Sequence, residues 1–300
     1  MDHWILPDLI VLLEVVRAGS FTRAAERLHT VQSNVTARIK TLERAAGVPL
    51  LQRHARSIKP TPAGEAALAL ALRLDAVMDD LRFTFGRGAQ ASMGKLRLGS
   101  IETTAASHLP AVVARYARQH PKVEVSVETG SSASLLKQLQ AGELDAVFVS
   151  RAPGITGFRE IVAFRDELAI VAPATLGSTA ELLASADTPV SVLVQRLGCS
   201  YTDRLLGYLK QKSKRSCRLR ELGTLEGVLG FVEVGAGVAA MPRTFARTAA
   251  GRRRLKLFPL PKKFAELKTY LVAPASRDSS FATNEFISCC ERPASGVSAA

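Results

Sequence analysis

The sequence has no uninterrupted apolar run of the roughly 18 residues that a membrane-spanning helix needs. Its most apolar early segment, ILPDLIVLLEVV, is interrupted by Asp8 and Glu14, and no cationic region precedes it. Only four cysteines are present, and they form no CxxC pair and no His/Cys spacing suited to zinc: Cys199, Cys217, Cys289 and Cys290. We therefore expect no secretory leader, no membrane partner and no metal, and a cytoplasmic protein with buried structural thiols.

The signatures of common enzyme classes are also missing. The sequence contains no P-loop, no GxGxxG after a strand, no nucleophile elbow and no HExxH. Its five histidines are scattered without ligand spacing. We expect neither enzymatic activity nor a bound cofactor.

What the sequence does have is length and positive charge. Three hundred residues, 47% of them hydrophobic, are enough for two or three domains with buried cores. The formal net charge of +13 indicates an acidic partner such as nucleic acid or an anionic membrane. Net charge alone also allows an alternative, namely a basic surface that has no acidic partner.

Residues 20–54 have the pattern of two short helices separated by a tight turn at HTVQ. The first helix has apolar residues at helical spacing (21, 24, 25 and 28) after an N-cap position at Ser20, and the second ends at Gly47. The outer face of the second helix offers hydrogen-bonding and cationic side chains, namely Ser33, Asn34, Thr36, Ala37, Arg38, Lys40 and Arg44. A helix of this size suits the major groove of DNA, although periodicity alone also allows an ordinary amphipathic hairpin.

The next stretch, LLQRHARSIKPTPAG, is basic and predicts a short two-stranded wing whose cations meet phosphate. It carries Arg53, His54, Arg56 and Lys59 with no acid before Glu65. From residue 29 to residue 60 the only acidic side chain is Glu43. Neutralised phosphates would make binding strongly dependent on salt.

The stretch GSFTRAAERLHTVQSNVTARIKTLERAAGVPLLQRHARSIKPTPAGE resembles the winged helix-turn-helix of LysR-type transcriptional regulators. The matching pattern runs through Gly19, Ser20, Ala24, Ala25, Leu28, Gln32, Val35, Ile39, Leu42, Glu43, Gly47, Leu50, Arg53, Thr61 and Gly64. Thr36 stands where the family commonly has Ser, and it keeps the hydroxyl group. Leu51 stands where the family commonly has Phe, and it keeps an apolar side chain. The resemblance implies a regulator that binds double-stranded promoter DNA, assembles as a homodimer or homotetramer, responds to a small-molecule effector and contacts RNA polymerase.

Specific DNA contacts follow from position on the second helix and the wing. The residues expected to approach base edges are Gln32, Ser33, Asn34, Thr36, Ala37 and Arg38. The residues expected to hold phosphate are Lys40, Arg53 and Arg56.

The segment AGEAALALALRLDAVMDDLRFTF is rich in helix formers and has no proline or glycine after Gly64. Its apolar residues Ala67, Leu70, Leu74, Val77 and Leu81 are spaced 3, 4, 3, 4. This spacing predicts a seam for a second copy formed by Leu70, Leu74, Val77 and Leu81. Packing of this helix on its own domain is the alternative, but the family uses its linker helix to pair two heads. GRGAQASMG, residues 86–94, is expected to be a hinge.

From Lys95 the pattern alternates between strands and helices, which predicts a parallel α/β sheet. The family resemblance continues in GELDAVFV and VGAGVAAMPR, and implies two α/β subdomains like those of a periplasmic binding protein, with crossovers near Phe164 and Lys263. The expected division is a winged helix-turn-helix at 1–62, a linker helix and hinge at 63–91, an effector domain at 92–293 and a disordered tail at 294–300. Subdomain I comprises about 92–163 and 265–293, and subdomain II about 164–264. A solute-binding protein without DNA binding is the alternative; it explains the α/β part and leaves the basic head unexplained.

Small polar residues gather at three predicted strand ends, at 99–104, 128–134 and 195–202. Ligands of open α/β sheets bind at such ends, so the expected effector contacts are Ser100, Thr103, Thr129, Ser131, Ser150 and Ser200. Each of them taken alone is better explained as a helix N-cap, and it is the recurrence at three strand ends that favours a cleft. The helix starts favour an anion, whereas Glu102, Glu128 and Asp145 would suit an amine. The segments TGSSASL, GCSY and MPR are most similar to putrescine-utilisation regulators of the family.

Overall fold

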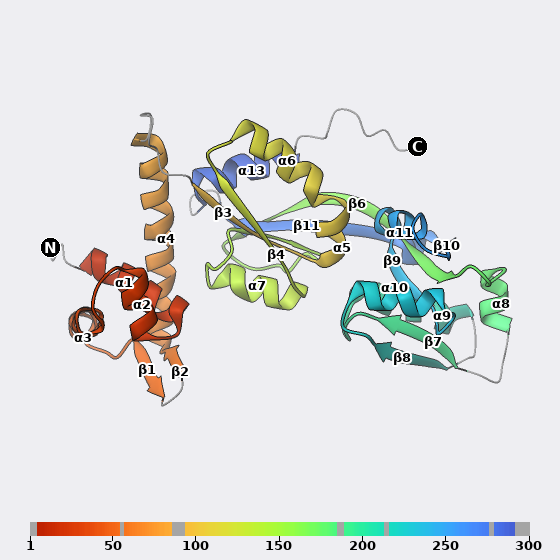
Figure 1. Cartoon of the computed structure of the whole chain (residues 1–300), viewed down its shortest axis with the longest axis horizontal. Coiled ribbons are helices and arrows are strands. Elements are labelled where there is room, and N and C mark those ends of the chain that lie inside the picture. Colours follow the sequence, from red (N-terminus) through yellow and green to blue (C-terminus); the bar gives the residue numbers. More distant parts are fainter. Residues whose placement is uncertain are drawn as a thin grey trace.

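The computed structural model describes residues 5–54, 57–85, 94–184, 189–212, 216–275 and 279–291. Figure 1 shows a small helical head, the long helix α4 beside it, and an elongated α/β unit. The hinge expected at 86–94 falls, apart from Gly94, outside the described residues, as do Arg56 and the tail at 294–300.

The head has the predicted helix pair, turn and wing. Its elements are α1 (Ile5–Ala18), α2 (Phe21–Arg27), α3 (Gln32–Ala46), β1 (Leu51–His54) and β2 (Ser57–Pro60), followed by α4 (Pro62–Phe85). The Ser20 side chain accepts the N–H of Arg23 at 3.5 Å, and Gly47 ends α3 with φ of 70°, a conformation that favours glycine. Both helix boundaries were readable from the sequence.

Helix α1 was not expected from the sequence, because its apolar residues do not keep to one stripe. Val11, Leu12, Leu13 and Val15 are all buried. The helix packs against α2, α3 and α4, so it lies at the centre of the head and buries several of its faces. This burial explains why a simple amphipathic pattern is absent.

The wing is tied to both neighbouring helices by a small set of hydrogen bonds. Glu43 Oε1 accepts the backbone N–H groups of Leu50 (2.9 Å) and Leu51 (3.2 Å). Thr61 Oγ1 donates to the carbonyl of Pro49 at 2.7 Å and accepts the N–H of Gly64 at 3.0 Å. A Cβ atom on Gly64 would lie 2.0 Å from the Leu50 carbonyl oxygen, so only glycine fits where α4 passes the wing.

The α/β unit has two subdomains. Subdomain I contains β3 (Lys95–Ser100), α5 (Glu102–Ser107), α6 (Leu109–Gln119), β4 (Glu124–Thr129), α7 (Ser132–Gln140), β5 (Ala146–Val149) and α13 (Phe281–Glu291). Subdomain II contains α8 (Thr179–Ala184), β7 (Val190–Val194), α9 (Ser200–Lys212), β8 (Cys217–Glu221), α10 (Leu225–Glu233), β9 (Ala239–Pro242), α11 (Arg243–Ala250), β10 (Leu255–Pro259) and α12 (Lys262–Ala265). As predicted, β3 pairs in parallel with both β4 and β5.

Two long strands, β6 (Phe158–Pro173) and β11 (Glu266–Pro274), belong to both subdomains. They run antiparallel along residues 158–167 of β6, and the next residues of β6 pair with β9 and β10 instead. The register shifts between Thr269 and Tyr270, where the sheet passes from one subdomain to the other. The predicted α/β fold with two subdomains is confirmed.

The sequence predicted only the second half of β6, at 167–173. The first half, FREIVAFRD, has charged residues and is only partly buried, because it pairs with β11 at the edge of the subdomain I sheet. Ile161, Ala163 and Phe164 of this half pack against the subdomain I core. Strand β10 and helices α8, α11 and α12 were also not expected, since each is short and mostly exposed or intermediate in burial.

We expect Gly64→Ala to destabilise the head by about 1–3 kcal/mol, because the added methyl group meets a backbone oxygen that cannot move alone. Hydrogen exchange of the α1–α3 amides, followed by mass spectrometry on the full chain, measures this loss locally. The matched control is Gly230→Ala in α10, where the nearest atom lies 4.0 Å away; it should stabilise its helix by about 0.5–1 kcal/mol. Unchanged exchange in the head of Gly64→Ala would contradict the crowding argument.

Candidate DNA interface and ligand cleft

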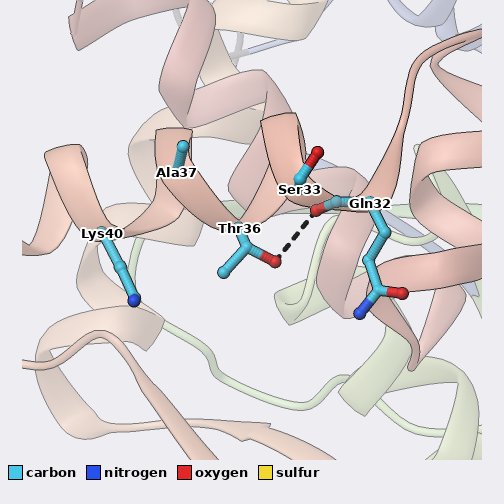
Figure 2. Close-up of a pocket in the computed structure, with 5 residues that line it drawn as sticks. All are labelled: Gln32, Ser33, Thr36, Ala37 and Lys40. Carbon is cyan, nitrogen blue, oxygen red and sulfur yellow. Dashed lines mark hydrogen bonds between the residues drawn. The ribbon is translucent and has the colours of Figure 1, made fainter.

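One face of α3 is open and polar. Its inward residues Val35, Ile39 and Leu42 are at most 4% exposed and pack in the head core. On the outside, five residues line a shallow hollow of about 470 Å³: Gln32, Ser33, Thr36, Ala37 and Lys40. Figure 2 shows Gln32, Thr36 and Lys40 pointing to one side of the helix, with Ser33 and Ala37 on the other side. The structure thus brings together five of the residues expected at the DNA.

Polar groups at the start of α3 are held in place by neighbours. Thr22 Oγ1 donates to Gln32 Oε1 at 3.1 Å, and Asn34 Nδ2 donates to Thr30 Oγ1 at 2.9 Å. Thr36 Oγ1 donates to the carbonyl of Gln32 at 2.9 Å. These bonds leave donor groups on Gln32 and Asn34 at an exposed helix start, where an incoming duplex can accept them.

Arg38 lies elsewhere, which differs from the expected base contact. Its Nε donates to Asp8 Oδ1 at 2.6 Å, and the Asp8 side chain is only 7% exposed. A buried carboxylate left without its partner is costly, so this pair ties α3 to α1. No local sequence pattern predicts this pair, because the two residues are 30 positions apart.

The wing residues are only partly described. Arg53 lies in β1 opposite Ile58, but its side chain is outside the described set, and Arg56 is outside it altogether. Lys59 is exposed on β2. The expected phosphate contacts of Arg53 and Arg56 therefore remain predictions.

The linker helix α4 has two different faces. Ala67, Leu68 and the fully buried Ala71 turn towards packed neighbours, and the first two join the head core. Leu70 and Val77 are 57% and 53% exposed, and Met78 beside them is 40% exposed. Leu74 is half-buried, and the side chain of Leu81 lies outside the described set. Leu70 and Val77 are thus accessible to a second copy, and the pairing of two helices along this seam remains a prediction.

A cleft of about 510 Å³ lies between the two subdomains. Its polar lining comes from the predicted strand ends and helix starts and includes Thr103, Thr129, Ser131, Ser150 and Ser200. Its apolar lining includes Leu193, Val194, Val228 and Met241 of subdomain II. The volume is in the range of small-molecule sites.

Four side-chain contacts cross this cleft. Ser200 Oγ donates to Ser150 Oγ at 3.1 Å, Thr103 Oγ1 and Tyr201 OH are 3.2 Å apart, and Arg151 is paired with Asp203 at 3.2 Å. Gln195 Nε2 also donates to Glu102 Oε2. Burial raises the pKa of Tyr201, so its hydroxyl stays protonated and able to donate. The two walls are therefore joined by hydroxyl and amide groups that a ligand can replace.

Ser100 departs from the expected set of effector contacts. It is fully buried, its Oγ donates to the carbonyl of Ile101 at 3.0 Å, and it is not among the residues that line the cleft. Its neighbour Glu102 lines the cleft instead. Of the other acids, Glu128 is not in the lining, and Asp145 binds Arg97 with Oδ1–Nη2 at 2.7 Å.

A polar cluster sits at the crossover between the subdomains. His108 of subdomain I lies 3.4 Å from Asp166 on β6 and stacks on Phe164, with ring centroids 4.6 Å apart. The backbone N–H of Thr244 in subdomain II donates to the same carboxylate at 3.3 Å. Burial alone would raise the pKa of Asp166, but the hydrogen bonds from His108, Glu167 and Thr244 hold it below its usual value. Asp166 thus joins both subdomains at their pivot.

Among the described residues, no group of three or more His, Cys, Asp or Glu side chains is arranged to hold a metal ion. Within the same part of the chain, no helix has the length and apolar character needed to cross a bilayer. The four cysteines are present as free thiols.

Comparison with known proteins places both parts of the chain. Residues 6–65 match the family model for the bacterial regulatory helix-turn-helix protein of the lysR family, and residues 89–294 match the LysR substrate binding domain. The HTH-type transcriptional regulator YofA of Bacillus velezensis is 35% identical over 260 residues, which cover 87% of this chain and 88% of that protein.

Solved structures share the fold. ArgP from Mycobacterium tuberculosis superposes with a TM-score of 0.74 at 20% identity, covering 95% of this chain and 97% of that one. Full-length CbnR complexed with its target DNA superposes with a TM-score of 0.55 at 20% identity, covering 96% and 98%.

The positions of Lys40 and Arg38 predict that replacing Lys40 weakens DNA binding, whereas replacing Arg38 lowers the stability of the head. Lys40→Ala should weaken binding to every DNA sequence alike and reduce the salt slope by about 0.9, because it removes one phosphate neutralisation. Its head should unfold like the wild type, since Lys40 is exposed. Arg38→Ala should destabilise the head by about 3 kcal/mol, because it leaves Asp8 buried and unpaired.

The measurements are DNA affinity at several salt concentrations and hydrogen exchange of the head. If the Arg38→Ala head is as stable as the wild type and the variant no longer discriminates at one base pair of the promoter, Arg38 contacts a base as first expected.

Proposed function

The chain belongs to the LysR family of bacterial DNA-binding transcriptional regulators with an effector-binding domain, and from that premise we propose how its own residues read DNA and sense a ligand. Promoter bases are read by Gln32, Ser33, Asn34, Thr36 and Ala37 at the start of α3, and phosphates are held by Lys40, Arg53 and Arg56. The observation that supports this is the open polar face of α3 above a fully packed inner face. The solute-binding alternative without DNA binding is set aside, because residues 6–65 match the helix-turn-helix model.

We propose residues 1–62 as the DNA-binding head, 63–91 as linker helix and hinge, and 92–293 as the effector domain. The protein would act in the cytoplasm without enzymatic activity, bound to promoter DNA and in contact with RNA polymerase. Membership of the putrescine-utilisation subgroup stays a proposal, because it is supported only by the three short segments TGSSASL, GCSY and MPR.

Pairing of two heads is proposed to use the exposed stripe of α4. One winged helix covers only a half-site, so a palindromic promoter needs two heads at a fixed spacing. Counted from Ala67, the stripe of Leu70, Leu74, Val77 and Leu81 repeats every 3.5 residues on average, which is the period that keeps two helices in contact. Leu70 and Val77 of this stripe are exposed in a single chain, so covering them with a second copy removes them from water.

Sensing is proposed to occur in the cleft between the subdomains. Thr103, Thr129, Ser131, Ser150 and Ser200 line it from both walls, so a ligand that touches both walls favours the closed arrangement. A coupling of about 1–3 kcal/mol between closure and head placement would change promoter occupancy several-fold or more.

The seam predicts that Leu70→Asp separates the dimer, because it would place a charge in an apolar contact. The matched control is Ala69→Asp, which changes an exposed neighbour on a different face of α4 and should leave assembly intact. Sedimentation of the full chain at micromolar concentration distinguishes the two. The seam would be wrong if the wild-type chain remained monomeric at tens of micromolar. It would also be wrong if the Leu70→Asp variant assembled like Ala69→Asp.

The cleft predicts that Thr129→Val combined with Ser200→Ala abolishes the transcriptional response and leaves DNA affinity unchanged. The promoter is found by sequencing the DNA that the protein binds in cells, and the response is measured with metabolites of the genes it controls. Ser126→Ala is the control, because this hydroxyl is exposed on β4 and does not line the cleft. Calorimetry that shows equal ligand binding by the wild type and the double variant would place the effector elsewhere.

A further inference from the structure

The cleft has an uneven distribution of charge. Of the described residues that line it, Glu102 is the only one that carries a carboxylate. Two arginines also line it, and both are exposed; one of them, Arg151, is already paired with Asp203 at 3.2 Å. The negative charge therefore sits within the cleft and the positive charges at its edge.

Glu102 is bonded to a neutral partner and not to a cation. Its Oε2 accepts from the amide Nε2 of Gln195 on the opposite wall. None of the ion pairs found between described residues includes Glu102. A carboxylate has two oxygens and about four lone-pair sites, so one amide donor leaves most of its acceptor capacity unused.

A purely structural role for Glu102 explains less of this arrangement. An acidic residue in the first turn of a helix stabilises the helix start, and Glu102 opens α5. However, α5 has only six residues, and the Glu102 side chain reaches across the cleft to subdomain II. A partly buried carboxylate without a cation costs free energy when closure removes water, and a ligand cation offsets this cost.

We propose that the effector carries a protonated amine that binds Glu102. This inference rests on the proposed ligand role of the cleft and adds the chemical class of the ligand. Gln195 orients the carboxylate from the opposite wall, so an amine bound there favours the closed arrangement. The hydrocarbon part of the ligand lies on the apolar lining around Leu193, Val228 and Met241. The starts of α7 and α9 also line the cleft and can accommodate an anionic group of the same ligand.

Three probes of one chain length test the amine: 5-aminopentanoate, n-pentylamine and pentanoate, each titrated into the full chain by calorimetry. The wild type should bind the two amines at least tenfold more tightly than pentanoate, which corresponds to about 1.4 kcal/mol. Glu102→Gln should lose at least tenfold for both amines and bind pentanoate as well as, or better than, the wild type. This variant keeps the size of the side chain and an oxygen that accepts from Gln195.

Gln195→Ala separates recognition from cleft closure. It removes the cross-cleft hydrogen bond and keeps the carboxylate, so it should weaken all three probes by a similar factor and preserve the preference for amines. Equal binding of pentanoate and the amines by the wild type would overturn the inference, as would equal losses for all probes in Glu102→Gln. Absence of amine binding at about 10 mM would overturn it as well, since that concentration is tenfold above a weak 1 mM dissociation constant.

Failure of the amine inference is distinguishable from failure of the ligand cleft. If pentanoate binds without amine preference and Thr129→Val with Ser200→Ala abolishes its binding, the cleft stands and only the amine is lost. If the double variant binds every probe as the wild type does, the cleft itself is wrong.

Discussion

The antiparallel pairing of β6 and β11 is the constraint on which the effector domain depends. Both strands are continuous through the two subdomains, and their register holds from Glu266 opposite Glu167 to Pro274 opposite Phe158 with one shift at Thr269. The subdomains therefore cannot separate without breaking a continuous ladder, and their motion is restricted to bending and twisting of these two strands. The shift at Thr269 and the Asp166 cluster lie along this crossover, where small backbone changes alter the cleft opening.

The walls of the cleft are held together much more weakly than each core. The buried leucine, valine and phenylalanine clusters of the two subdomains are separate, and between them lie polar contacts such as Ser150–Ser200 and Thr103–Tyr201. A neutral hydrogen bond of this kind contributes about 1 kcal/mol net, because water replaces it when the cleft opens. Several such bonds set a balance between open and closed arrangements that a ligand with a few good contacts can shift.

Sequence reasoning gave the fold, the helix boundaries at Ser20 and Gly47, and most of the cleft lining, because these depend on local patterns of apolar residues, caps and strand ends. It failed where a residue's role is set by a distant partner. Arg38 and Lys40 are both basic residues of α3 two positions apart, but the ion pair with Asp8 is made by Arg38. Ser100 and Glu102 are two residues apart, and only the packing of β3 decides that the hydroxyl is buried while the carboxylate reaches the cleft. The first half of β6 was missed because it is a partly buried edge strand with charged residues, whose pairing with β11 depends on a segment about 100 residues away.

The net positive charge correctly indicated a nucleic-acid partner. Most of that charge, however, does not lie in the DNA-binding head. Residues 1–62 hold 9 basic and 5 acidic side chains, whereas residues 165–263 hold 17 and 8, so most of the excess of +13 lies in subdomain II. What marks the head as a DNA-binding unit is the local depletion of acid on α3 and the wing, where Glu43 is used to hold Leu50 and Leu51 and Asp8 is covered by Arg38. Glu43 and Asp8 are thus engaged by the head itself, which reduces their repulsion towards phosphate. For an interface of this size, where a few contacts set the affinity, the arrangement of charge matters more than its total.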